Sequence, residues 1–305
     1  MPNDFLSIDD LTLYEFNLIL EKAQDIKKNP SKFHGKLQNK ILAMIFQKPS
    51  LRTRMTFEAG MLQLGGEAIY LSPSDIQIGI RESIHDVGKN LERWVNAIMI
   101  RTFAHQDVID LADVVHIPVI NALTDLLHPC QAMADVLTLK EKKGDLTRCK
   151  LAYVGDGNNV CHSLLFAAAK AGYHIAVATP AGYEPEISIV RKAKLAGKQT
   201  GAEFFLTKNP YEAADGADAV YTDVWASMGQ EHEKNERAKI MLPYQVNKAL
   251  MGKAKPDAIF MHCLPAHRGE EVTGEIIDSS QSVVFDQAEN RLHVQKSILL
   301  LLLEK

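Results

Sequence analysis

A short polar stretch after the apolar run at residues 41–46 has the residue types that bind phosphate. It reads Gln-Lys-Pro-Ser-Leu-Arg-Thr-Arg and leads into a helix-period segment, which Ser50 or Thr53 is suited to cap. The N–H groups and the dipole at a helix start favour an anion, and arginine adds a planar fork for phosphate oxygens. The alternative is an ordinary capped helix with Arg52 and Arg54 solvated; the glycines of a Walker loop are absent.

Two more apolar runs in the first half end in residues that suit the same chemistry. Residues 97–100 are followed by Arg101, and residues 118–121 are followed by His128 and Gln131. Ligands of open α/β sheets bind beyond the carboxyl ends of the strands, so we expect these side chains at one site. Taken alone, His128 is more often a structural histidine, and its neighbours change that balance only modestly.

A Gly-Asp-Gly turn opens the second half of the chain. Gly155 and Gly157 match the start of a dinucleotide-binding fingerprint, but Val160 stands where its third glycine belongs. No acidic partner for a ribose is evident further on. We therefore prefer a turn that lets a helix approach the sheet, with Asn158 and Asn159 available to present amides to a ligand.

Asp223 ends another apolar run and is followed by the loop Ser227-Met228-Gly229. A carboxylate, a hydroxyl and exposed backbone N–H groups together suit the ammonium and carboxylate of an amino acid. The alternative is a capped loop that leads into a charged, solvated helix.

The stretch Met-His-Cys-Leu-Pro-Ala-His places Cys263 near the end of a buried strand. The Leu264–Pro265 bond is a candidate for the cis form, which costs little before proline. A buried cysteine is commonly just a small hydrophobe. The spacing of His262, Cys263 and His267 fits no usual zinc site, so we expect no metal.

Short β-rich runs alternate with helix-period stretches along the chain, which predicts an α/β fold with parallel sheets covered by helices. An early helix is expected from the helical spacing of the apolar residues Leu11, Tyr14 and Leu18, with Ser7 or Asp9 as its cap. The predicted strands are residues 41–46, 97–100, 118–121, 151–155, 174–179, 203–207, 219–223, 258–263 and 282–286.

The 305 residues suggest two domains. A helix expected over residues 132–143 ends at Gly144-Asp145, and a new strand–helix series starts at Leu151. We therefore predict a first domain of residues 1–145 and a second of residues 146–287, joined by helices because no low-complexity linker separates them. A C-terminal helix over residues 288–305 would complete the first domain.

Bulk composition excludes several classes of protein. The net charge of −4 argues against a nucleic-acid or anionic-membrane partner, and the longest aliphatic run, Ile298–Leu303, is too short to span a membrane. Four cysteines without a Cys-x-x-Cys pair fit a reducing compartment, so a cytoplasmic location is expected. These cysteines are Cys130, Cys149, Cys161 and Cys263.

The segments PSLRTR, HPCQ, GDGNN, TDVWASMG, MHCLPAHRGEEV and AENR, in this order, resemble the motifs of the carbamoyltransferase family over essentially the whole chain. SMG and HCLP favour its ornithine branch, since the aspartate enzymes have a proline at the position of Cys263. The resemblance implies two Rossmann-like domains with central parallel sheets, linked by helices, and a C-terminal helix that packs back on the first domain. It also implies a homotrimer or a multiple of trimers. The implied reaction converts carbamoyl phosphate and L-ornithine to L-citrulline and phosphate, with no cofactor.

Matching motif positions imply residue roles. Thr53, Arg101 and His128 would polarise the carbamoyl carbonyl, Gln131 would accept from its amide, and Gln77 would reach a neighbouring subunit's phosphate. The implied carbamoyl-phosphate residues are Ser50, Leu51, Arg52, Thr53, Gln77, Arg101, His128, Gln131, Cys263, Leu264 and Arg291. The implied ornithine residues are Asn159, Asp223, Ser227, Met228 and Cys263, and the catalytic set is Arg101, His128, Asp223 and Cys263.

Cys263, oriented by Asp223, would contact the δ-nitrogen of ornithine as a proton relay and not as a covalent nucleophile. An unperturbed δ-ammonium has a pKa of about 10.4, so it needs help to lose its proton at pH 7. One departure from the family is Leu51, where the commonest phosphate turn has threonine; we expect a modest loss of affinity.

Three other functions compete with this interpretation. Another carbamoyltransferase would use putrescine or N-acetylornithine, although SMG suits a free amino-acid head. A nicotinamide-dependent dehydrogenase rests only on the GDGNN turn. A regulatory protein that has lost turnover is disfavoured, because the matched motif positions are chemically intact apart from Leu51.

Overall fold

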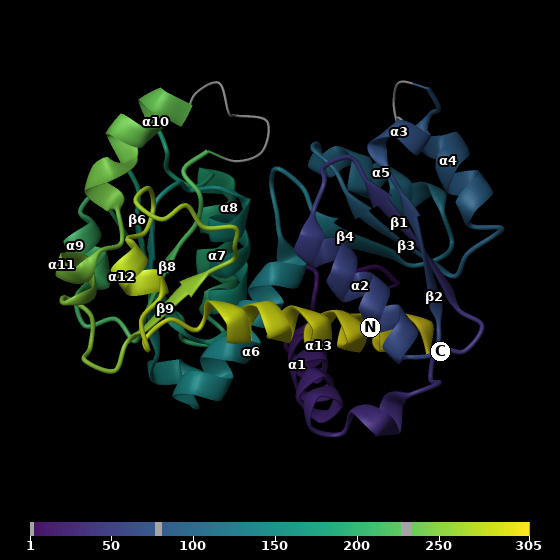
Figure 1. Cartoon of the computed structure of the whole chain (residues 1–305), viewed down its shortest axis with the longest axis horizontal. Helices are drawn as coiled ribbons and strands as arrows, with labels where there is room; N and C mark the ends of the chain where they lie inside the picture. The colour runs from purple at the N-terminus through teal and green to yellow at the C-terminus, as the bar shows by residue number, and fades with distance from the viewer. Residues whose placement is uncertain (1–2, 77–80, 227–233, 305) are drawn as a thin grey trace. The chain divides into compact units, whose positions relative to one another are not determined.

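The computed structural model describes residues 3–76, 81–226 and 234–304. The chain divides into two compact units (Figure 1). Unit 1 comprises Met1–Leu137 and Glu289–Lys305, and unit 2 comprises Thr138–Ala288. Both divisions fall inside helices, α6 (Pro129–Lys143) and α13 (Val284–Leu303). The prediction that helices join the two parts is therefore confirmed.

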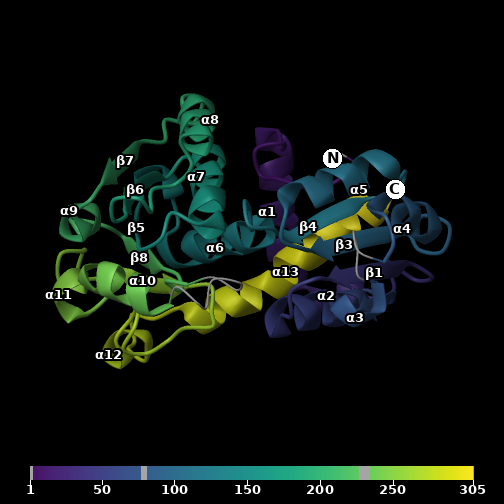
Figure 2. The same cartoon turned by 90° about the horizontal axis from the view of Figure 1, so that it is seen from above.

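Unit 1 contains a parallel sheet with the strand order β2-β1-β3-β4. Ala43, Ile45, Ile98 and Ile100 lie on one face of this sheet and pack against apolar residues of α4 and α5, a layer that can be followed in Figure 2. The strands are β1 (Ile41–Phe46), β2 (Glu67–Leu71), β3 (Ala97–Arg101) and β4 (Val119–Leu123). The helices are α1 (Leu13–Lys28), η1 (Pro30–Phe33), α2 (Leu51–Gln63), α3 (Pro73–Ile76), α4 (Ile84–Leu91) and α5 (His105–Val114).

Two features of unit 1 differ from the sequence prediction. Strand β2 was not expected. It pairs only with β1 at the sheet edge, and its residues are exposed or half-buried. Helix α1 begins after Thr12, which forms a capping box with Glu15, so the predicted caps are wrong. Of the apolar residues at helical spacing, Leu11 is buried but precedes the helix, and Tyr14 is 74% exposed. The buried face carries Phe16, Ile19, Leu20, Ala23 and Ile26.

Unit 2 contains a second parallel sheet with the strand order β7-β6-β5-β8-β9. Helices α7 and α8 lie side by side (Figure 2). The strands are β5 (Lys150–Val154), β6 (His174–Ala178), β7 (Phe204–Thr207), β8 (Ala219–Thr222) and β9 (Ile259–His262). The helices are η2 (Leu146–Arg148), α7 (Asn159–Ala171), α8 (Ile187–Gly197), α9 (Pro210–Ala214), α10 (Lys234–Met241), η4 (Leu242–Tyr244), α11 (Lys248–Met251) and α12 (Gly274–Ile277).

The strand predicted over residues 282–286 is wrong. Ser282 forms only an isolated bridge with Phe260, and helix α13 begins at Val284. Val283 and Val284 are buried, whereas Phe285 is 74% exposed. The Val-Val-Phe run therefore looks like a strand in sequence but serves as the entry to a helix, because only part of it contacts the core.

Helix α13 packs on unit 1, as predicted (Figure 1). Ser297 Oγ donates to the Ile19 carbonyl of α1 at 2.8 Å, and Lys296 Nζ donates to Gln63 Oε1 of α2 at 3.0 Å. Across the described ranges, no helix combines the length and apolar character that a membrane span requires. All four cysteines are free.

Candidate active site

Helix α2 begins directly after the polar stretch that the sequence singles out. Ser50 is its N-cap, and its Oγ accepts from the backbone N–H of Thr53 at 3.3 Å. Thr53 itself is buried and lies in the first turn. The remaining N–H groups of this turn and the helix dipole are suited to an anion. Leu51, the departure from the usual motif, is 73% exposed.

Arg291 of α13 connects α2 with α6. Its Nη1 donates to Gln131 Oε1 at 2.6 Å, and its Nη2 donates to Thr53 Oγ1 at 3.2 Å. Gln131 Nε2 in turn donates to Asp135 Oδ1 at 2.8 Å, which fixes which end of the amide faces the arginine. Sequence reasoning missed Asp135; its place one turn after Gln131 on the same helix was the available signal.

His128 lies at the start of α6 and is 5% exposed. Burial and the positive charges of Arg291, Arg101 and Arg52 hold the pKa of His128 well below its usual range. The imidazole is therefore neutral at pH 7 and acts as a neutral hydrogen-bonding group. The structure thus brings three predicted arginines into the electrostatic surroundings of the predicted histidine.

Two basic residues of the same stretch have other partners. The guanidinium carbon of Arg54 lies 3.9 Å from the centroid of the Tyr70 ring, and its Nε donates to Glu58 at 3.3 Å. Lys48 is buried, pairs with Asp125, and lies 4.2 Å from the centroid of the Phe103 ring. Lys48 therefore anchors the turn before α2, a role that sequence reasoning missed.

In unit 2, Asp223 directly follows β8, the strand that lies between β5 and β9 in the sheet. Its carboxylate accepts from Asn158 Nδ2 at 2.7 Å and from the Cys263 thiol at 2.9 Å. Strands β5, β8 and β9 are adjacent and parallel, so the residues that follow them meet at one sheet edge. The predicted pair of Asp223 and Cys263 is brought together. Asn158 contacts Asp223 through its Nδ2, while its Oδ1 caps α7. The predicted ornithine contact of Asn159, the first residue of α7, stays a prediction.

The loop after β9 is held by a buried pair of side chains. His262 Nδ1 accepts from the backbone N–H of Leu264 at 2.8 Å, so its proton is on Nε2, which lies 3.2 Å from Glu271 Oε1. The same oxygen accepts from the backbone N–H of His267 at 2.5 Å. Glu271 therefore holds both ends of the segment that carries Cys263. The predicted cis bond between Leu264 and Pro265 is present.

Glu271, which forms a clamp on this loop together with His262, keeps its negative charge despite its burial. The side chains of His262 and Glu271 are both 0% exposed. Although burial by itself raises it, the hydrogen bonds from His262 and from the His267 backbone bring the pKa of Glu271 below its usual value. Glu271 is consequently an ionised acceptor for both donors. Sequence reasoning did not identify it; its acidic character after an exposed loop carried no distinguishing signal.

Two groups of three possible metal ligands occur among the described residues. Asp223, His262 and Cys263 form one group, and His267, Glu270 and Glu271 form the other. In the first group the thiol donates to the carboxylate, and both ring nitrogens of His262 have partners in the protein. These donor atoms thus serve the hydrogen-bond network just described.

Cys263 also differs from the other cysteines. Burial raises the pKa of Cys130 and of Cys149 to about 12, and raises that of Cys161 well above its usual value. Those three thiols are inert small hydrophobes. Cys263 is only partly buried.

The Gly-Asp-Gly turn is filled by the chain itself. Gly157 N–H donates to the Tyr183 carbonyl at 2.9 Å, and a Cβ on Gly157 would lie 2.3 Å from the Pro185 nitrogen. This glycine therefore permits close approach of the loop after β6, which removes the basis for a nicotinamide cofactor at this turn. Three predicted site residues, Gln77, Ser227 and Met228, lie outside the described residues.

The two parallel α/β units and their strand-end residues define a Rossmann-like enzyme class. Similarity to known proteins identifies the family within this class. The family model for the aspartate/ornithine carbamoyltransferase carbamoyl-P binding domain matches residues 3–141. The model for the Asp/Orn binding domain of the same family matches residues 147–302. The chain therefore belongs to the aspartate/ornithine carbamoyltransferase family.

Individual relatives agree with this assignment over nearly their whole length. An ornithine carbamoyltransferase of Anoxybacillus flavithermus is 54% identical over 302 residues, covering 98% of this chain and 96% of the relative. The Pyrococcus furiosus ornithine carbamoyltransferase structure has a TM-score of 0.95 at 53% identity, covering 98% of this chain and 96% of that one. The Thermus thermophilus enzyme has a TM-score of 0.90 at 45% identity, covering 99% of both chains.

Proposed function

We propose that the chain transfers the carbamoyl group of carbamoyl phosphate to the δ-amine of L-ornithine, which yields L-citrulline and phosphate. The observation that carries this proposal is the Cys263–Asp223 pair, within 2.9 Å, at the strand ends of a domain of the aspartate/ornithine carbamoyltransferase family. The relatives from Anoxybacillus flavithermus and Pyrococcus furiosus are named for the same activity, ornithine carbamoyltransferase.

The phosphate end of the donor is assigned to unit 1. The start of α2, with Ser50, Leu51, Arg52 and Thr53, supplies backbone N–H groups, hydroxyls and one guanidinium, and Arg291 supplies another. The carbamoyl carbonyl is assigned to Thr53, Arg101 and the neutral His128. Preorganised donors of this kind stabilise the oxyanion that develops as nitrogen attacks. Gln131 retains acceptor capacity beyond its bond to Arg291 and is assigned to the carbamoyl amide.

The acceptor amine is assigned to unit 2. The Cys263 thiol donates to Asp223, so its sulfur lone pairs point away from its own proton and are available to the δ-nitrogen. The Leu264 carbonyl is a second acceptor for that nitrogen, while Asp223, Ser227 and Met228 are assigned to the amino-acid head. The neutral amine attacks the carbamoyl carbon, the bond from that carbon to the phosphate oxygen breaks, and the amine proton leaves through the Cys263–Asp223 pair.

A ureido-product assay tests this function directly. Purified chain is supplied with carbamoyl phosphate and, in parallel, with L-ornithine, N-acetylornithine or putrescine. We expect citrulline from ornithine at a kcat/KM at least about 100-fold above that of the other two amines, because both lack a free amino-acid head. Preference for either alternative amine would overturn the assignment of Asp223 to that head.

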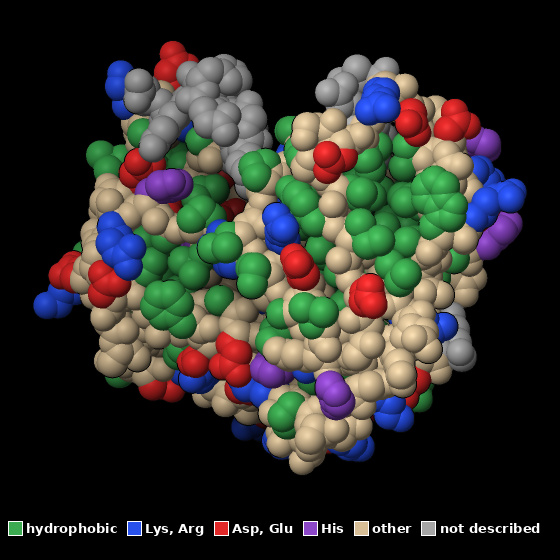
Figure 3. Space-filling view, turned by 45° about the vertical axis from the view of Figure 1, so that its right-hand side comes forward, with side chains coloured by type: hydrophobic (Ala, Val, Ile, Leu, Met, Phe, Trp, Pro, Cys, Tyr) green, Lys and Arg blue, Asp and Glu red, His purple; other side chains and the backbone are tan. Residues whose placement is uncertain are grey.

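We also propose that the chain assembles as a homotrimer or a multiple of trimers. Helix α2 and the edge strand β2 expose Leu51, Met55 and Ile69, and Figure 3 shows hydrophobic side chains gathered on the surface of unit 1. Exposed apolar surface of this kind is typical of subunit contacts. Light scattering coupled to size-exclusion chromatography should give about three chain masses or a multiple; a monomer at micromolar concentration contradicts the proposal.

A further inference from the structure

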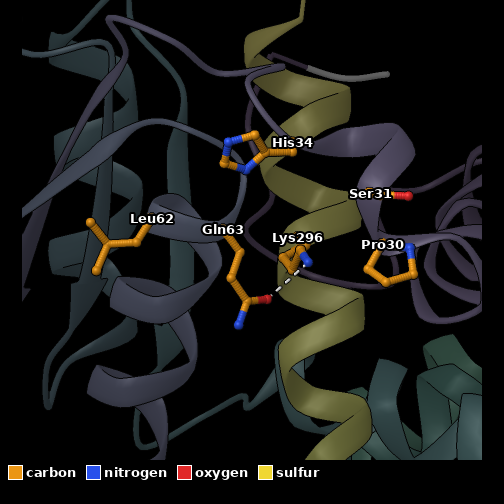
Figure 4. Close-up of a pocket in the computed structure, with 6 residues that line it drawn as sticks. All are labelled: Pro30, Ser31, His34, Leu62, Gln63 and Lys296. Carbon is orange, nitrogen blue, oxygen red and sulfur yellow. Dashed lines mark hydrogen bonds between the residues drawn. The ribbon is translucent and has the colours of Figure 1, made fainter.

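A pocket of about 650 Å³ opens in unit 1, away from the residues assigned above (Figure 4). It lies where η1, the C-terminal end of α2 and helix α13 meet. Three of its side chains come from the segment after α1, and its most buried polar group is an amine from α13. The lining residues are Pro30, Ser31, His34, Leu62, Gln63 and Lys296.

Lys296 is the unusual member of this lining. The residue is 2% exposed, and its stem passes closely over Gly60, where a Cβ would lie 3.2 Å from the lysine Cγ. Its ammonium donates to Gln63 Oε1 at 3.0 Å, a contact drawn in Figure 4. Within the described parts of the chain Lys296 takes part in no ion pair, so its one acceptor is a neutral amide.

A buried ammonium next to a neutral amide is an incomplete electrostatic arrangement. Taking a charge out of water is costly unless an opposite charge is supplied. In agreement, burial lowers the pKa of Lys296. An anion in the pocket would supply the charge that the protein does not, and Ser31 and His34 in the same lining carry groups that can donate.

The surrounding sequence favours the same type of ligand. Residues 27–40, which contribute Pro30, Ser31 and His34, contain five lysines and no carboxylate, although the whole chain has a net charge of −4. Part of this charge is compensated, since Lys32 pairs with Asp25 and Lys36 with Glu304. The pocket itself has no carboxylate in its lining, so it remains positive.

We propose that this pocket binds a phosphate group, with the Lys296 ammonium as its counter-charge and Ser31 and His34 as flanking donors. The ligand is either free inorganic phosphate or the phosphate end of a small ester. This site is separate from the proposed carbamoyl-phosphate site and does not take part in the transfer reaction.

Equilibrium dialysis with radiolabelled inorganic phosphate tests the proposal at constant ionic strength. The full chain is first saturated with a bisubstrate mimic, a phosphonoacetyl group joined to the δ-nitrogen of ornithine, so that the active site cannot take up phosphate. We expect about one further phosphate per wild-type chain. Lys296→Met should weaken this binding at least about tenfold, since it removes the one buried cation of the pocket lining.

Two further variants separate a built site from a diffuse positive surface. Gln63→Glu places a carboxylate beside Lys296, so it should abolish phosphate binding while the fold is kept. Lys36→Met removes a lysine of the same basic segment that pairs with Glu304 outside the lining, so it should change the affinity by less than about twofold. Glycerol phosphate, dialysed in parallel, distinguishes an ester ligand from free phosphate.

The outcomes are decisive. Three results would each overturn the proposal. Phosphate binding could persist in Lys296→Met, it could fall equally in Lys36→Met, or the wild-type chain could bind neither phosphate nor glycerol phosphate. If the mimic fails to occupy the active site, one extra phosphate appears in every variant alike. The difference between wild type and Lys296→Met then still reports on the pocket, so failure of the proposed function is recognised separately.

Discussion

The two units present their candidate site residues in opposite electrostatic surroundings. In unit 1, a neutral His128 lies in the field of Arg52, Arg101 and Arg291. In unit 2, a carboxylate, Asp223, is held between a neutral amide and a thiol. A positive cluster suits a doubly charged acyl phosphate, and a carboxylate suits a substrate that arrives as a cation. Charge complementarity therefore assigns a different substrate to each unit.

The units also hold these residues in different ways. In unit 1, Arg291 connects helices α2 and α6 through partners 238 and 160 residues away in sequence. In unit 2, one buried carboxylate, Glu271, holds a loop whose residues lie within nine positions of it. Long-range bonds tie the phosphate residues to the core of the domain, whereas a local clamp shapes the amine loop. Substitutions in the two units should therefore affect different kinetic constants.

The largest effect is expected from Arg52→Ala. Removing this guanidinium should raise the KM for carbamoyl phosphate at least about 100-fold, in line with about 3 kcal/mol for a lost charge-assisted contact. The ornithine KM should change far less. Initial rates at varied carbamoyl phosphate provide the measurement, and Arg54→Ala is the control because Arg54 is directed to Glu58 and Tyr70. An equal rise of the carbamoyl phosphate KM in both variants would mean that binding depends on the overall positive charge and not on Arg52 in particular.

The next effect is expected from Cys263→Ser. A hydroxyl is a poorer match for the spacing between Asp223 and an amine, so the KM for ornithine should rise about tenfold or more. Binding of carbamoyl phosphate, measured calorimetrically without ornithine, should stay within about twofold. Unchanged kcat and KM for ornithine would show that the thiol is only a packing residue.

The clamp can be tested by comparing Glu271→Ala with Glu271→Gln. Alanine leaves the N–H groups of His262 and His267 without an acceptor, at about 1–3 kcal/mol each, so the ornithine KM should rise about tenfold. Glutamine keeps an oxygen at this place and should recover most of the activity. A lower melting temperature of the alanine variant with wild-type ornithine kinetics would limit Glu271 to a stabilising role.

Acid should weaken the two sites in separate pH windows. The pKa of His128 is lowered on folding, so the unfolded chain binds more protons near pH 6, and stability falls as pH drops below about 6.5. The pKa of Glu271 is also lowered, but its contribution is complete above about 4.5 and is lost only as pH falls through the lower folded value.

Urea unfolding at several pH values measures this difference. Between pH 7.5 and 5.5, His128→Asn should lose less stability than wild type, by up to about 1.4 kcal/mol per pH unit. Glu271→Gln should match the wild-type slope in that range and deviate only below about pH 4.5. A wild-type slope in His128→Asn would mean that other groups cause the loss.

The smallest effect is expected from Leu51→Thr, which restores the usual phosphate turn. The side chain at this position is 73% exposed, and the backbone donors of α2 remain in either variant. The KM for carbamoyl phosphate should fall by no more than about threefold. A change above tenfold would show that a hydroxyl at this position contacts the phosphate directly.

Regular patterns made much of this molecule predictable. Strands β1, β3, β5 and β9 are buried on both faces, so their apolar runs stand out, and the caps and strand ends nearby mark Ser50 and Arg101. Strand β2 was missed although residues 68–71 are apolar; it lies at a sheet edge, where its residues are exposed or half-buried. The run at residues 282–286 has the pattern but begins a helix, since apolar runs of that length do not distinguish the two structures.

Individual contacts were less predictable than site positions. The contact of Asn158 with Asp223 depends on a side chain that caps α7 with one end and reaches the carboxylate with the other. The roles of Asp135 and Glu271 likewise depend on hydrogen bonds within the folded units. Neighbouring residues of the same type look equal in sequence, and a difference of one position moves a side chain by about 100° around a helix.

By itself, the sequence determined the alternation of strands and helices, the strand ends that carry polar residues, and the family to which these motifs point. Local propensity and hydrophobic period encode such features within a few residues of each other. The tertiary structure alone decided that Arg291 meets Thr53 and Gln131, that His128 stays neutral among arginines, and that Lys296 is buried with a neutral amide as its acceptor. Burial and charge depend on residues far apart in the chain, and these meet only when the chain is folded.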